Sequence, residues 1–91
     1  MVYTVNEYCD ENGRSPYDEW LSSLRDAKAK AKVISAVDLM ELGSLGDSEP
    51  VGEGVSERRI HYGPGYRVYY AREGKTIFLL LCGGDKSTQK K

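Results

Sequence analysis

The pattern of hydrophobic and polar positions changes from alternating to helical and back, which predicts two helices between strands. Residues 2–8 alternate β-branched or aromatic residues with polar ones, the period of a half-exposed strand. Ser15 followed by proline is a typical helix start, with serine as the N-cap. Asp26 can cap a second helix, which Gly43 is suited to end. Because the connection between them is short, we expect the two helices to run antiparallel.

The second half of the chain returns to strand-forming sequence, interrupted by turns. Residues 43–54 are polar and rich in glycine, so we expect a loop there. Three runs of β-forming residues follow, separated by glycine-containing turns: 55–62, 66–72 and 76–82. The last run is apolar on both of its faces. It should therefore be a central strand, either covered on both sides or paired along both edges.

In order, these elements give β-α-α-β-β-β within one domain covering residues 1–91. We therefore predict an α+β fold with two antiparallel helices packed on one face of a small, mostly antiparallel sheet. The side chains expected to be buried together come from both helices and from the three last strands: Trp20, Leu21, Ile34, Val37, Ile60, Val68 and either Leu79 or Leu80.

Composition narrows the class of protein. Hydrophobic residues make up 40% of the chain and charged residues 30%, which is typical of a soluble globular domain. No apolar run is long enough for a membrane span, and the N-terminus lacks the features of a signal peptide, so we expect a cytoplasmic protein. The two cysteines have no metal-ligand spacing and no acidic cluster is visible, so we expect neither a metal nor another cofactor.

The net charge of -1 conceals an asymmetry along the chain. Residues 1–54 hold 5 Lys/Arg against 11 Asp/Glu, whereas residues 55–91 hold 8 Lys/Arg against 3 Asp/Glu. A strongly basic half is typical of proteins that bind polyanions. The alternative is that the two halves neutralise each other within the fold, and charge alone favours neither interpretation.

Alternation along the first predicted hairpin gathers polar side chains on one face. If Ile60 and Val68 point at the helices, the opposite face receives four residues: Arg59, His61, Arg67 and Tyr69. Cations opposite one another on neighbouring strands repel unless something lies between them. Such a face is therefore shielded by nearby carboxylates, built to bind an anion, or simply solvated.

The residue types on this hairpin suit a phosphodiester. Guanidinium groups clamp phosphate oxygens, tyrosines stack on unpaired bases, and histidine transfers protons near neutral pH. Cleavage without a metal favours RNA, because the ribose 2′-hydroxyl is an internal nucleophile that DNA lacks. The side chains that we expect to bind RNA are Arg58, Tyr62, Tyr69 and Arg72.

Several segments together resemble a known family. Residues 52–70 and 79–89, with 13–21 and 43–47, look like the phage-derived, Gp49-like (HigB-type) toxins of the RelE/ParE superfamily. These proteins, also called addiction module killer proteins, belong to bacterial type II toxin–antitoxin modules. The resemblance implies a RelE-like fold and a metal-independent, ribosome-dependent endoribonuclease that cuts mRNA, with a cognate antitoxin as its partner.

Carried over by position, the resemblance implies four catalytic residues: Arg59, His61, Arg67 and Lys86. Arg58 stands where similar toxins have an apolar residue. The chain ends at Lys91, where similar toxins continue into a last helix, so we expect the domain to lack that helix.

Two other functions stay open at this stage. The ParE-like branch of the superfamily poisons DNA gyrase without cutting RNA. A degenerate member could instead bind only its antitoxin, or RNA, as an interaction module.

Overall fold

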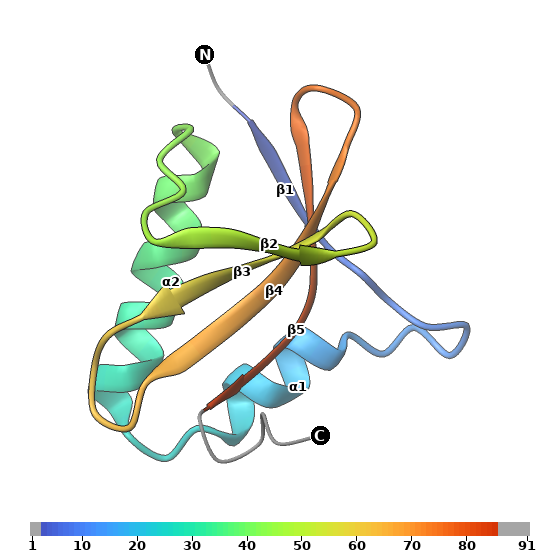
Figure 1. Cartoon of the computed structure of the whole chain (residues 1–91). Helices are drawn as coiled ribbons and strands as arrows, with labels where there is room; N and C mark the ends of the chain where they lie inside the picture. Colours follow the sequence, from blue (N-terminus) through green and yellow to red (C-terminus); the bar gives the residue numbers. More distant parts are fainter. Residues whose placement is uncertain (1–2, 86–91) are drawn as a thin grey trace.

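The computed structural model describes residues 3–85, which form two helices on one face of a five-stranded sheet (Figure 1). The elements follow the order β1 (Thr4–Glu7), α1 (Pro16–Ser23), α2 (Ala27–Glu41), β2 (Ser48–Gly52), β3 (Val55–Ile60), β4 (Tyr66–Glu73) and β5 (Ile77–Asp85). The predicted α+β class is confirmed, but the sheet has one strand more than predicted. Within the described residues, no helix is long and apolar enough to cross a membrane.

The strand order in the sheet is β1-β5-β4-β3-β2. β1 pairs with β5 in parallel, and the other three pairings are antiparallel. β5 therefore has a neighbour on both edges, as its apolar sequence predicted. The parallel pairing of the first and last strands needs a long connection between them, which the helices and the intervening strands supply.

The additional strand, β2, lies within the stretch that was expected to be a loop. Pro50 and Gly52 disfavour a strand in this sequence, but an edge strand tolerates proline because its outer N–H groups need no partner. β2 pairs only with β3, placing Glu49 opposite Glu57, and the register shifts between Pro50 and Gly52. The strand thus depends on its neighbour, which is why local sequence did not reveal it.

Both helices begin at the predicted caps. The Ser15 hydroxyl accepts a hydrogen bond from the Asp18 amide at 3.0 Å, and the Asp26 carboxylate accepts one from the Lys28 amide at 2.9 Å. Gly43 follows α2 with a φ of 88°, the left-handed conformation that glycine adopts at helix ends. The two helices make little contact with each other, because α1 packs mainly on β5 while α2 reaches β1 and β3 (Figure 1).

The core lies between the helices and the sheet. Ile60, Val68 and Leu80 are buried there as predicted, and Trp20, Leu21 and Val37 pack partly buried against them. The prediction was wrong for Ile34, which is 43% exposed. The buried stripe of α2 is instead Ala29, Val33, Ala36 and Met40. This helix is rich in alanine and carries apolar residues on two neighbouring stripes, so periodicity could not decide which one faces the sheet.

Gly83 in β5 leaves the space in which the Trp20 side chain packs against the sheet. A Cβ atom at position 83 would overlap the indole ring, so the sheet offers the ring a flat backbone surface only because the residue is glycine. The indole also lies 6.4 Å from the Tyr66 ring, centroid to centroid. The contact fixes α1 on the end of β5 closest to the candidate site.

Candidate functional site

The strand register brings the predicted cations together on the face of the sheet opposite the helices. Arg59 in β3 is the direct partner of Arg67 in β4, and Glu57 is the partner of Tyr69 on the same face. His61 follows immediately after β3. Because Ile60 and Val68 are buried under the helices, alternation turns this set to the opposite side, as predicted.

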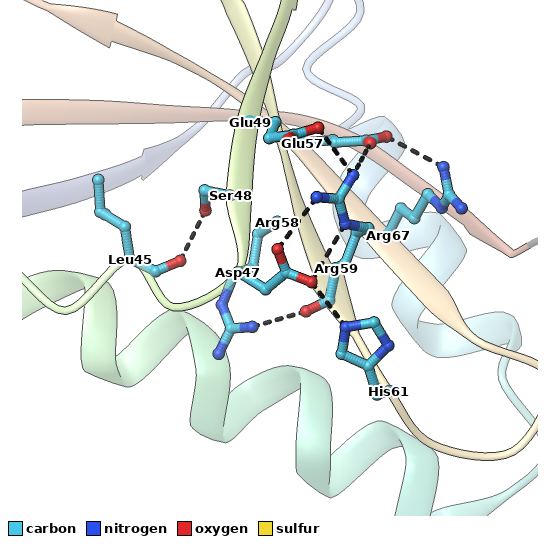
Figure 2. Close-up of polar contacts among 9 residues, drawn as sticks. All are labelled: Leu45, Asp47, Ser48, Glu49, Glu57, Arg58, Arg59, His61 and Arg67. Carbon is cyan, nitrogen blue, oxygen red and sulfur yellow. Dashed lines mark hydrogen bonds and ion pairs between the residues drawn. The ribbon is translucent and has the colours of Figure 1, made fainter.

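Arg59 is surrounded by carboxylates (Figure 2). Its Nε and Nη2 donate to the two oxygens of Asp47 at 3.2 and 3.0 Å. Its Nη1 donates to Glu49 at 3.2 Å and to Glu57 at 2.8 Å. All three guanidinium nitrogens are thus engaged, and these bonds raise the pKa of Arg59, with Asp47 the largest contributor.

Glu57 links the two arginines. Its Oε2 accepts from Arg59, and its Oε1 accepts from Arg67 Nη1 at 3.2 Å. The Glu57 side chain is only 8% exposed, whereas those of Arg59 and Arg67 are 24% and 20% exposed. A buried carboxylate between them removes the repulsion that two facing guanidinium groups would otherwise suffer.

Asp47 also holds His61. The Asp47 Oδ2 atom lies 2.6 Å from His61 Nε2, and the imidazole is 74% exposed. Hydrogen bonds from Arg59 and then His61 lower the pKa of Asp47 from 3.8 to about 2, so its carboxylate is ionised at neutral pH and can only accept. The hydrogen on this contact therefore belongs to His61 Nε2. In a neutral imidazole, Nδ1 is then the atom that can accept a proton.

The carboxylates settle one of the alternatives that the sequence left open. Cations from the basic half pair with acids from the acidic half, so the two halves neutralise each other here. Sequence reasoning did not single out Asp47, Glu49 or Glu57. Glu57 carried a usable signal, because it precedes Arg59 by two residues and alternation places both on one face. Asp47 and Glu49 gave none, because their position depends on β2.

Arg67 has fewer hydrogen-bond partners among the described residues than Arg59 has. Its Nη1 donates to Glu57, and within residues 3–85 its Nε and Nη2 have no acceptor. A cleft of about 410 Å³ lies beside it, formed by the end of β3, the turn at 63–65 and the start of β4. Arg59, His61, Tyr62 and Arg67 all line this cleft. It could receive an anion with Arg67 as the principal donor.

The predicted RNA-binding residues do not share one surface. Tyr69 lies on the face of Arg59 and Arg67. Tyr62 donates a hydrogen bond to Asp26 at 3.2 Å and has the Lys32 ammonium over its ring, so it turns towards the helices. Arg72 lies on the helix-facing side of β4 with Val68, and its guanidinium stacks on the rings of Tyr3 and Phe78. Lys86, the fourth predicted catalytic residue, lies outside the described residues.

Arg58 also points away from the candidate site. It is the register partner of Val68, so it occupies a helix-facing position, the place where an apolar residue was expected. Its Nη1 donates to the carbonyl of Arg59 at 2.6 Å, and its guanidinium lies against Gly46, where a Cβ atom would overlap it. Arg58 and Arg59 are therefore neighbours in sequence that serve opposite faces of the sheet.

Comparison with known proteins agrees with the resemblance in the sequence. Residues 19–91 match the family described as Phage derived protein Gp49-like (DUF891). The chain is also 45% identical over 75 residues to an uncharacterized protein of Haemophilus influenzae, covering 82% of this chain and 76% of the relative. The chain belongs to the Gp49-like family, which is associated with toxin–antitoxin systems.

Proposed function

We propose that this chain is the toxin of a type II toxin–antitoxin module and acts as a metal-independent, ribosome-dependent mRNA endoribonuclease. The observation that carries the proposal is the pair Arg59 and Arg67, directly opposite each other on the sheet face away from the helices, with His61 at its margin. Membership of a toxin–antitoxin-associated family supports it. A sheet with two helices on one face also suits the RelE-like arrangement that the resemblance implies.

In this proposal, His61 begins the reaction. Asp47 holds the Nε2–H of the imidazole and leaves Nδ1 directed elsewhere, so Nδ1 accepts the proton of the ribose 2′-hydroxyl. The resulting 2′-oxygen attacks the adjacent phosphorus, forming a bond to O2′ while the bond to the 5′-oxygen of the next nucleotide breaks. Asp47 thus orients the base and stabilises the imidazolium that forms.

Arg67 stabilises the charge that builds on the phosphate. Its Nε and Nη2 groups, which have no acceptor among residues 3–85, can donate to a non-bridging oxygen, while Glu57 keeps the guanidinium in place. Arg59 acts indirectly, because its donors already face carboxylates: it holds Asp47, which orients His61, and Glu57, which bonds to Arg67. Lys86 is the candidate donor of a proton to the leaving 5′-oxygen.

The test is induction of the gene in a bacterium, with growth and transcript ends as the readouts. Arg67→Ala should remove a preorganised donor worth ~3–4 kcal/mol of barrier, a loss of roughly 100- to 1000-fold in cleavage. Arg67→Lys should recover only part of this, because lysine keeps the charge but loses the planar fork. Arg14→Ala is the control, since the Arg14 side chain is 68% exposed and, within residues 3–85, pairs only with Glu19.

Messages cut at codon-related positions by the parent chain, and not by folded Arg67→Ala, would support the proposal. Full toxicity of folded Arg67→Ala would show that the phosphate is held elsewhere. DNA breaks in place of cut messages would favour the gyrase-inhibitor function.

A second candidate function is a non-catalytic module that binds its antitoxin or RNA. The observation that favours it is the complete occupation of the Arg59 guanidinium by Asp47, Glu49 and Glu57. An arginine in this state has no donor ready for a phosphate. Unimpaired growth on induction of the parent chain, with intact transcripts and a co-purifying antitoxin, would select this candidate.

A further inference from the structure

A groove on the other side of β3 holds cations that have no acidic partner among residues 3–85. It lies between α2 and β3, has a volume of about 370 Å³ and is open to solvent. Its apolar lining consists of Ala31, Ala36, Leu39 and Ile60. Leu39 is 43% exposed, a high value for a large apolar side chain beside a groove. The groove thus offers an apolar surface that a partner could cover.

Arg58 gives this groove an uncompensated charge. Its Nε is buried and lacks a hydrogen-bond partner, and within residues 3–85 its guanidinium forms no ion pair. Among the described residues, its side chain donates one hydrogen bond, to the neutral carbonyl of Arg59. Holding a charge in a partly buried position without a counter-ion costs free energy, which a carboxylate from outside would offset.

The remaining charges at the groove have the same sign. The titratable side chains that line it are Lys32, Arg58, Arg59 and His61, all of them basic. Arg59 and His61 already have carboxylates on the open face. The Lys32 ammonium lies over the Tyr62 ring, 5.5 Å from its centroid, and no acidic residue within 3–85 pairs with it. The charges without acidic partners are therefore Arg58 and Lys32.

We propose that this groove binds an acidic, amphipathic segment of a partner protein. One apolar side chain of that segment rests on Ala31, Ala36 and Ile60, and flanking carboxylates pair with Arg58 and Lys32. A peptide fits these features better than RNA does, because the floor is made of small aliphatic side chains and Tyr62 is already covered by Lys32. In the proposed function, on which this identification of the partner rests, the segment belongs to the antitoxin.

The experiment uses the whole chain, labelled with ¹⁵N, and two synthetic helical peptides. The first peptide carries leucine at positions i and i+4 with glutamate beside them, and the second has glutamine in place of every glutamate. The glutamate peptide should shift the amide signals of α2 residues at the groove, Ala31, Ser35 and Leu39. It should bind about tenfold more tightly than the glutamine peptide, the difference expected for a charge-assisted contact.

Arg58→Met and Lys32→Gln should each reduce this preference for glutamate. Methionine retains the apolar stem of Arg58 and removes a buried charge, so the fold is expected to persist. Lys30→Gln is the matched control, because Lys30 lies on the same helix but does not line the groove.

Equal affinity for the two peptides would overturn the proposal, as would the absence of shifts at α2 or shifts confined to the open face around Arg67 and Tyr69. Shifts at the groove with a single-stranded RNA oligonucleotide, and not with the glutamate peptide, would reassign it to nucleic acid. None of these outcomes depends on cleavage. A failure here is thus distinct from a failure of Arg67→Ala in the growth assay.

Discussion

Replacing Glu57 with glutamine tests whether the buried carboxylate holds the candidate site together. Glutamine preserves the volume of the side chain but removes its charge. The single carbonyl oxygen of glutamine can accept from either Arg59 or Arg67. Its NH2 group then faces the other guanidinium, so that donors face donors. The substitution therefore leaves one arginine without its partner at a position where the register keeps the two side chains opposite each other.

The size of the effect follows from burial. Removing one partner of a buried ion pair costs ~3–5 kcal/mol, and Glu57 is 8% exposed, so this range applies. Arg59 keeps Asp47 and Glu49, which places the expected loss at the lower end, about 3 kcal/mol. For a domain of this size, each kcal/mol lowers Tm by ~4–8 °C, so Glu57→Gln should lower Tm by roughly 12–24 °C.

The assay is thermal unfolding followed by circular dichroism, with Glu49→Gln as the matched control. Glu49 is the register partner of Glu57 and contacts the same arginine at 3.2 Å, but its side chain is 65% exposed. Solvent screens such a pair, so Glu49→Gln should leave Tm nearly unchanged. If both variants unfold at the temperature of the parent chain, burial gives Glu57 no special role, and the reasoning is wrong.

Three further predictions concern the same structure. His61→Gln should reduce cleavage less than Arg67→Ala does if Lys86 shares the proton transfer, which mapping of transcript ends would measure. Because the pKa of Asp47 falls from 3.8 to about 2 on folding, its contribution to stability is present above pH 4 and is lost as pH falls towards 2. The difference in free energy of unfolding between the parent and Asp47→Asn, measured with urea, should therefore be larger at pH 5 than at pH 2.5. An equal difference at the two pH values would contradict the lowered pKa of Asp47. Gly83→Ala should destabilise the fold by ~1–3 kcal/mol through overlap with Trp20, and unchanged urea unfolding would show that α1 can move aside.

Local signals determined the elements that the sequence predicted correctly. The cap at Ser15 depends on an amide three residues away and the cap at Asp26 on an amide two residues away, so a short window of sequence contains the whole interaction. Alternation along β3 and β4 likewise decided which face each residue occupies once Ile60 and Val68 were assigned to the core. That step alone placed Arg59 and Arg67 on one face, and the strand register then made them direct partners.

The errors concern contacts between residues distant in the chain. Packing against the sheet decides which stripe of α2 is buried, because two stripes of that helix are similarly apolar. β2 exists because β3 offers it a partner, despite a proline and a glycine that disfavour a strand. The resemblance in the sequence suggested an apolar residue at position 58, and only the packing against Gly46 shows how an arginine fits there.

The sequence by itself thus determined the α+β class, the helix starts and the shared face of Arg59, His61 and Arg67. Only the tertiary structure decided what lies beside them. Asp47 is 12 residues from Arg59 along the chain and 14 from His61, and it reaches both because β2 is in register with β3. The ion pairs that a cation forms depend on which charges lie nearest to it in space, and pairing between strands sets those distances. The same physics leaves Arg58 without a carboxylate among the described residues, although it is adjacent to an arginine that has three.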